Sequence, residues 1–285
     1  MILGVALATL LSVSPVNHPT PTPALGASTH TSQVEAATPT LALGETLMAA
    51  ATIPVITPTP RDLPLSKATS SSGLGVFNSV AISAARLPAA GLWQEARQRD
   101  YTDLFNANCA ASRLGSCDSR FATRLRNAAS QVAGFTELEM LDHVNRAVNA
   151  AMTYRSDRAI WGVGDRWATP IEMAGKGAGD CEDFAIAKYW LLRSLGVSDD
   201  KLQMVVLQDT RRQLFHAVLV VHTASGAYVL DNVTNRLQLD TAYAQYQPIM
   251  SFAGGKNYIH GFAAGSTTVA AMPGDLSAVA PGLGM

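Results

Sequence analysis

The sequence is poor in features that mark several common classes of protein. It has only three cysteines in 285 residues, 15% charged residues and a formal net charge of -1. Without a basic run or stripe, nothing indicates a nucleic-acid or acidic-lipid partner. No apolar stretch approaches the ~20 residues needed to span a bilayer. A soluble or secreted protein is therefore predicted, with no nucleic acid among its partners.

The first 74 residues also lack what a folded core requires. No Lys or Arg precedes Arg61, and Pro, Thr, Ala and Ser dominate the sequence that follows Val13, to about Pro64. Such a composition buries too little apolar surface to offset the entropy of ordering. The apolar run from Ile2 to Val13 has the length of a signal peptide. Residues 1–74 are predicted to be a signal-like segment and a disordered leader, in a periplasmic or secreted protein.

Two alternatives to export stay open, because the usual positively charged start of a signal peptide is missing apart from the amino terminus itself. In one, the start codon is misassigned, and Met48 is a candidate start. In the other, the segment is a disordered leader without a targeting role.

Residues 75–262 are predicted to form one domain, since ~190 residues suffice for one substantial core. Apolar periodicity predicts helices over 92–99, 120–132 and 137–152, which would form a helical lobe. Thr136 and Glu139 have capping-box spacing at the start of the last one. Residues 263–285 are small, mixed in polarity and rich in Gly and Pro, and are predicted to be a disordered tail.

Strand-forming residues follow from position 201 onward. They occupy 201–208, 215–223 and 227–230, and a Thr-Ala-Ser-Gly turn joins the last two runs. Three further short apolar stretches are expected to add an edge to this sheet: Tyr246, Pro248–Met250 and Tyr258–Ile259.

Cys181 lies where a glycine-containing loop is predicted to become a helix. Apolar residues from Phe184 to Leu195 recur three or four apart, and Gly196 follows at the position of a C-terminal stop. The N–H groups of a helix's first turn favour negative charge and lower the pKa of a nearby thiol. Cys181 is therefore a candidate nucleophile. The alternative is a small buried core residue, which is what most free cysteines are.

A histidine and a carboxylate on the predicted hairpin could complete a catalytic set. If Thr223 to Gly226 form the turn, His216 faces Val233, and Asp231 is its diagonal neighbour on the same face. A carboxylate at that place can accept the imidazole N–H and fix its tautomer. A structural histidine, and an aspartate that merely ends a strand, are the alternatives.

Acidic residues surround Cys181 and present an electrostatic problem. Asp180, Glu182 and Asp183 would disfavour the thiolate and raise its pKa. A hard cation held by carboxylate and carbonyl oxygens would neutralise them, and calcium is the usual choice outside the cytoplasm. Helix N-termini also favour acidic residues in any protein, so simple capping is the alternative.

The remaining cysteines, Cys109 and Cys117, lie close together in a loop-like stretch. They could close a small disulfide and leave Cys181 as the free thiol, as suits an exported protein with one reactive cysteine. Two unpaired thiols, or a weak metal pair, in a cytosolic protein are the alternative.

Taken together, these motifs resemble the bacterial transglutaminase-like cysteine proteinase family, whose LapG-type members are periplasmic proteases that cut large surface adhesins. The resemblance covers roughly Gly75 to Phe262. The matching residues are Asp165, Trp167, Thr169-Pro170, Gly179 to Asp183, Ala185 to Tyr189, Leu195 to Val197, His216 to Leu219 and Leu230 to Asn232.

The resemblance implies a papain-like arrangement on a transglutaminase-type α+β core, with the nucleophile helix packed on an antiparallel sheet. In it, Cys181 would attack a peptide carbonyl, His216 would carry the proton, and Asp231 would orient His216. It also implies calcium dependence, with Asp180 and Glu182 as ligands. Asp183 is less suited to this role because its side chain turns away along the helix.

The implied partner is a protein substrate at the cell envelope, such as an adhesin. A membrane receptor that sequesters the protease occurs in LapG-type systems, and no residue of this chain indicates whether one acts here. Two other functions use the same residues. An acyl transferase would pass the acyl group of the thioester to an amine, and a non-catalytic module would only bind peptide or metal.

Overall fold

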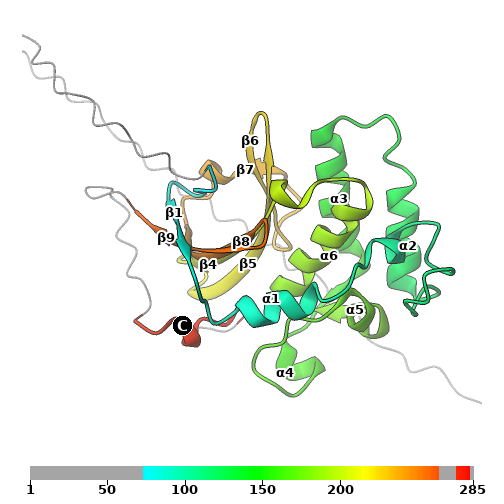
Figure 1. Cartoon of the computed structure of the whole chain (residues 1–285), viewed down its shortest axis with the longest axis horizontal. Coiled ribbons are helices and arrows are strands. Elements are labelled where there is room, and N and C mark those ends of the chain that lie inside the picture. Colours follow the sequence, from blue (N-terminus) through cyan, green and yellow to red (C-terminus); the bar gives the residue numbers. More distant parts are fainter. Residues whose placement is uncertain (1–72, 263–273, 283–285) are drawn as a thin grey trace, which may run out of the picture. The chain divides into compact units, whose positions relative to one another are not determined.

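An antiparallel sheet of seven strands with helices on one side carries the domain (Figure 1). The computed structural model describes residues 73–262 and 274–282, which belong to one compact unit, Leu63–Met285. The predicted signal-like segment and nearly all of the leader lie outside the described residues. The α+β fold class predicted from the sequence is confirmed.

The strands follow the order β1-β9-β8-β4-β5-β6-β7 across the sheet. A separate parallel pair, β2 and β3, lies before the nucleophile helix. Their bounds are β1 Val80–Ala84, β2 Thr153–Tyr154, β3 Ala178–Gly179, β4 Leu202–Asp209, β5 Leu214–Thr223, β6 Gly226–Leu230, β7 Gln238–Leu239, β8 Tyr246–Ala253 and β9 Lys256–Gly261.

Six α-helices and four short 3-10 turns occur in the described part of the chain. The helices are α1 Ala90–Ala96, α2 Arg120–Ala129, α3 Glu137–Ala151, α4 Asp157–Ile160, α5 Pro170–Lys176 and α6 Cys181–Ser194. The 3-10 turns are η1 Thr102–Phe105, η2 Asp199–Lys201, η3 Asp240–Ala242 and η4 Leu276–Ala278.

Local sequence signals explain where these helices begin. The predicted capping box of Thr136 and Glu139 opens α3. A second capping box, of Thr169 and Glu172, opens α5, with Pro170 in the first turn. Both boxes satisfy N–H groups that a helix start leaves unpaired.

Helix α6 lies at the centre of the domain. Its residues from Cys181 to Leu192 are all buried, because the sheet strand β5 packs on one side and α3 and η1 on others. The helix ends near Leu195, and Gly196 follows with a left-handed φ of 88°. The predicted stop is thus confirmed. The sheet positions this helix, and the helix positions Cys181.

Long-range pairing differs from the prediction in two places. Residues 246–253 and 256–261 do not add an edge, because β8 pairs with β4 and β9 pairs with β8 inside the sheet. The edge on this side is β1, which pairs with β9 and was not predicted.

Trp167 lies in the core, 3% exposed, with its ring edge-on to those of Trp93 and Phe252.

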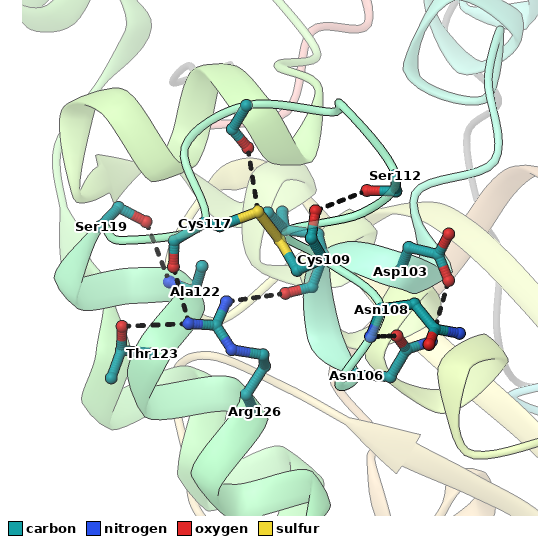
Figure 2. Close-up of a disulfide and its surroundings, with 12 residues drawn as sticks. Asp103, Asn106, Asn108, Cys109, Ser112, Cys117, Ser119, Ala122, Thr123 and Arg126 are labelled. Carbon is teal, nitrogen blue, oxygen red and sulfur yellow. Dashed lines mark hydrogen bonds between the residues drawn. A yellow bond between two sulfur atoms is a disulfide. The ribbon is translucent and has the colours of Figure 1, made fainter.

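The structure contains the expected disulfide between Cys109 and Cys117. Figure 2 shows the bridge beside α2, where the Arg126 guanidinium donates a hydrogen bond to the Cys117 carbonyl oxygen at 2.7 Å. Ser119 caps the same helix by accepting from the Ala122 amide at 3.1 Å. The bridge closes the loop between η1 and α2, and the Arg126 hydrogen bond ties that loop to α2.

Part of the predicted tail lies against the domain. Residues 274–282 contain η4, and Val279 is only 4% exposed within the main hydrophobic core. The apolar Val279 side chain has a place in that core, which the composition of the tail did not indicate. Residues 263–273 and 283–285 lie outside the described part.

Within the described residues, no helix is both long enough and apolar enough to cross a membrane.

Candidate active site

Cys181 is the first residue of α6, directly after the capping position held by Asp180. Its backbone N–H is therefore one of the first-turn donors without an intrahelical partner. Cys181 is the free cysteine of the chain and is 2% exposed. Its thiol donates a hydrogen bond to Glu182 Oε2 at 3.3 Å.

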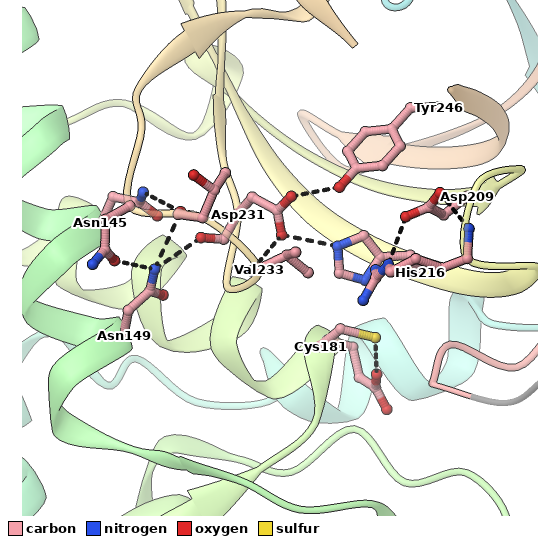
Figure 3. Close-up of polar contacts among 12 residues, drawn as sticks. Asn145, Asn149, Cys181, Asp209, His216, Asp231, Val233 and Tyr246 are labelled. Carbon is pink, nitrogen blue, oxygen red and sulfur yellow. Dashed lines mark hydrogen bonds and ion pairs between the residues drawn. The ribbon is translucent and has the colours of Figure 1, made fainter. Parts of the chain in front are cut away.

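His216 and Asp231 come together as the hairpin prediction requires. His216 Nε2 lies 2.9 Å from Asp231 Oδ1, and both side chains are buried (Figure 3). Figure 3 shows the sulfur of Cys181 beneath the His216 ring, on the side away from Asp231. With Nε2 committed to Asp231, Nδ1 is the nitrogen left to handle the thiol proton.

The hairpin register explains this meeting. His222 pairs with Ala227 as predicted, and β5 and β6 remain paired as far as Leu219 and Leu230. The predicted pairing of His216 with Val233 is wrong, because β6 ends at Leu230 and the chain turns there. Asp231 makes that turn by accepting the Val233 amide at 3.0 Å. The carboxylate thus reaches His216 from the end of a strand.

Two further residues hold Asp231, and sequence reasoning missed both. The Tyr246 hydroxyl donates to Asp231 Oδ2 at 2.6 Å, and Asn149 Nδ2 donates to the Asp231 carbonyl oxygen at 2.9 Å. Tyr246 starts β8 and Asn149 lies on α3, so neither neighbours Asp231 in sequence. Only the three-dimensional fold brings them together, although the sequence predicts that Tyr246 belongs to a strand.

Asp231 is prepared to remain ionised. Burial alone would raise its pKa, but the hydrogen bond and charge of His216 oppose this, assisted by Tyr246 and Val233. The net result is a pKa well below the usual range of an aspartate. A lasting negative charge beside the imidazole favours the imidazolium form that a general base passes through.

The environment of the thiol opposes ionisation in the absence of a cation. Burial, followed by the negative charge of Asp180, raises the pKa of Cys181 to about 12. The electrostatic problem predicted from the sequence is therefore present. Compensation of the nearby carboxylate charge would therefore lower the pKa of the thiol.

Those carboxylates form a buried cluster around the start of α6. Asp157, Asp180 and Glu182 each offer one oxygen within 4.8 Å of the others. Burial and the charge of Asp180 raise the pKa of Asp157 to about 7 and that of Asp165 to about 6. For Glu182, burial, then Cys181 and Asp180, raises the pKa well above its usual value. A cation would offset this repulsion.

The predicted ligands Asp180 and Glu182 are thus in the cluster, whereas Asp157 was not predicted. Its backbone N–H donates to Asp180 Oδ2 at 3.1 Å. One carboxylate oxygen of each of these three residues is buried without a hydrogen-bond partner among the described residues: Asp157 Oδ1, Asp180 Oδ1 and Glu182 Oε1. Buried oxygens left without donors are what a hard cation would bind.

Asp183 has a different role from its neighbours. Its Oδ1 accepts the Ala168 amide at 2.8 Å, which ties the Trp167 segment to α6. A Cβ at Gly179 would lie 2.5 Å from the Asp183 side chain, so glycine is required there. Asp183 thus makes its own contact and is not among the three residues of the carboxylate cluster, Asp157, Asp180 and Glu182.

Lys188, two turns along α6, is fully buried, and sequence reasoning gave it no role of its own. Burial lowers its pKa to about 7, although the charge of Asp231 favours its protonated form. Its ammonium lies 6.0 Å from the centroid of the Phe184 ring. Lys188 is therefore a buried amine whose protonated form interacts electrostatically with Asp231.

A thiol at a helix N-terminus, facing a buried His–Asp pair on an adjoining sheet, defines the class of papain-like and transglutaminase-like cysteine enzymes. Such a site performs acyl chemistry through a thioester.

Comparison with known proteins places the chain within that class. Residues 107–254, just over half of the chain, match the sequence profile of one family. That family is described as "Bacterial transglutaminase-like cysteine proteinase BTLCP". The chain belongs to this family and is a cysteine peptidase, as predicted from its motifs. The search of curated proteins returns no match.

Three solved structures of Legionella pneumophila LapG are similar to this chain over 53% of its length. In the first of them, the matched region covers 84% of the LapG chain at 26% sequence identity, with a TM-score of 0.44. In the calcium-bound form, the match covers 84% of the LapG chain at 26% sequence identity, with a TM-score of 0.45. In the EGTA-treated form, it covers 82% of the LapG chain at 27% sequence identity, with a TM-score of 0.44.

Proposed function

We propose that this chain is a calcium-supported cysteine endopeptidase that acts outside the cytoplasm on a cell-envelope or adhesin-type protein. The observation that carries the chemistry is the buried His216–Asp231 pair, 2.9 Å apart, above Cys181. The disulfide between Cys109 and Cys117 supports an oxidising compartment.

In the proposed reaction, His216 Nδ1 takes the thiol proton as Cys181 Sγ attacks the peptide carbonyl. Asp231 stabilises the resulting imidazolium and holds the ring in place. The free N–H of Cys181 is one donor for the developing oxyanion. His216 then protonates the leaving amine, which leaves a thioester on Cys181. A water molecule, deprotonated by His216, hydrolyses the thioester and restores the thiol.

The carboxylates fit a calcium ion by their chemistry. Asp157, Asp180 and Glu182 are hard oxygen donors, buried and close together. A bound calcium ion would supply positive charge that offsets their repulsion. The negative charge of Asp180 beside the thiol would then be compensated, and the pKa of Cys181 would fall toward the working range.

Incubation of the purified protein with envelope proteins of its own host tests this function. We expect a cleaved species that requires calcium, disappears in excess chelator, and is absent with Cys181→Ala. Cleavage by Cys181→Ala would contradict the assigned nucleophile, and full activity in excess chelator would remove the metal.

The same incubation with an added primary amine separates hydrolysis from acyl transfer. Hydrolysis predicts a new free carboxyl terminus on the product even when the amine is abundant. Product that carries only the amine, with no hydrolysed species, would favour a transferase.

A further inference from the structure

The described C-terminal segment, residues 274–282, packs onto the domain through a few contacts. Asp275 accepts hydrogen bonds from the Ser277 amide at 2.8 Å and hydroxyl at 2.6 Å, which hold the short turn η4. Val279 and Pro281, beyond that turn, are buried, whereas Ala278, the last residue of η4, is exposed. Every second side chain beyond the turn, Val279 and then Pro281, is thus buried against the domain.

The end of this segment lies at the candidate active site. The Gly282 amide donates to the Phe215 carbonyl oxygen at 2.9 Å, and Phe215 directly precedes His216. A Cβ at Gly282 would lie 3.4 Å from Asp180 Oδ2, beside Cys181. The segment therefore contacts both elements that carry the reacting side chains, the start of α6 and the first half of β5.

The sheet leaves room for an additional chain at this place. Among the described pairings, β6 covers β5 from Leu219 to Thr223, which leaves the half that carries His216 outside the hairpin ladder. Extended peptides bind proteins by pairing their backbone with such a strand. The Gly282 to Phe215 hydrogen bond is a contact of this kind.

Burial of the reacting groups agrees with a covered site. Cys181 is 2% exposed and His216 is 1% exposed. A peptide substrate must reach both, so a chain segment that lies against them competes with substrate for the same space.

We propose that residues 274–282 occupy the substrate groove as an internal competitor, which a substrate chain displaces before Cys181 reacts. The inference rests on the proposed peptidase function for its consequence, while the covering of Cys181 is testable without a substrate. The docked contact is small, with two buried side chains and one main-chain hydrogen bond to β5. It is therefore suited to reversible displacement.

The test measures how fast iodoacetamide alkylates Cys181, the only thiol outside the disulfide. The variants are a chain that stops after Pro273 and the full-length Val279→Asp. We expect both to react roughly tenfold faster than wild type or more, since a site open for a tenth of the time reacts at a tenth of its full rate.

Ala278→Asp is the matched control, because it adds the same charge at the neighbouring exposed position. It should leave the alkylation rate at the wild-type value. A synthetic peptide of residues 274–285, added to the truncated chain, should slow alkylation again. Circular dichroism confirms that each variant remains folded.

Unchanged alkylation in folded Val279→Asp and in the truncated chain would overturn the proposal. An unfolded truncated chain that the added peptide does not protect would also overturn it, since the domain would then need the segment in order to fold. Faster alkylation without cleavage of any protein would leave the segment's role intact and contradict the peptidase function instead. Faster cleavage by the truncated chain supports both.

Discussion

Tyr246 shows how a single side chain outside the reacting set prepares the site. Its hydroxyl donates to Asp231 at 2.6 Å, and its ring lies edge-on to that of His216 with centroids 5.8 Å apart. It therefore fixes both members of the pair. We regard Tyr246 as a positioning residue.

Tyr246→Phe should lower kcat roughly tenfold, because a hydrogen bond to a charged group contributes ~1.5–3 kcal/mol. The loss should grow at low pH, since Asp231 becomes easier to protonate without the donor. Tyr243→Phe is the matched control: that ring stacks on Tyr246 at 5.0 Å, but its buried hydroxyl has no hydrogen-bond partner among the described residues. Equal effects of the two variants on kcat would refute a positioning role.

His260, which lies away from the candidate site, should make the stability of the fold sensitive to acid. It is buried between Ser79 and Ser251, and burial lowers its pKa from 6.5 to about 4. Between these values the unfolded chain binds a proton that the native chain does not. The free energy of unfolding contributed by this group should therefore fall as pH decreases, by ~1.4 kcal/mol per pH unit.

Urea unfolding at pH 7 and pH 5 checks this, with wild type compared to His260→Gln. The comparison is necessary because the buried carboxylates, with raised pKa values, contribute in the opposite direction. The variant should lose less stability between the two pH values than the wild type, or gain more. An identical pH dependence in both proteins would mean that His260 protonates freely in the native state.

At the scale of elements, the capping box at the start of α3 makes a measurable contribution to the free energy of unfolding. Thr136→Ala removes the acceptor for the Glu139 amide, and the free energy of unfolding should fall by ~1 kcal/mol. Thr136→Ser keeps the hydroxyl and should cost much less. Chemical denaturation of both variants measures the difference, and an equal loss would assign the effect to the threonine methyl group.

Elements set by local signals were predictable from sequence. The capping box opens α3 where predicted, and α6 starts at Cys181 because the loop, the acidic turn and the apolar spacing agree. The hairpin register was also predictable, since a short turn fixes which residues face each other. The predicted register holds as far as Leu219 and Leu230, and the turn at Asp231 then brings its carboxylate to His216.

Features set by distant parts of the chain were not predictable in this way. The order β1-β9-β8-β4 depends on pairings between the two ends of the domain. Asp157 reaches Asp180 only because β2 and β3 lie side by side ahead of α6. The burial of Val279 likewise depends on a surface that no local pattern describes.

The whole molecule should respond to metal through the buried carboxylates. Calcium at 100 times its dissociation constant would stabilise the native state by ~2.7 kcal/mol. A chelator should then lower Tm by several degrees, as followed by calorimetry. Asp157→Asn should reduce the difference, whereas Asp142→Asn, an exposed partner of Arg146, should not. No change of Tm with calcium or chelator would leave the cluster as a set of protonated capping groups.

Strand β1 has a practical consequence for work on fragments of this protein. The family match spans residues 107–254, which excludes β1, α1 and β9. A fragment trimmed to those limits would lose Trp93, which packs on Trp167, and would leave β8 as a bare sheet margin. Exposed edge strands can pair with strands of other molecules and cause aggregation. Recombinant expression is therefore expected to give soluble material when cloning limits lie outside Val80 and Gly261, and precipitate when they follow the homology boundaries.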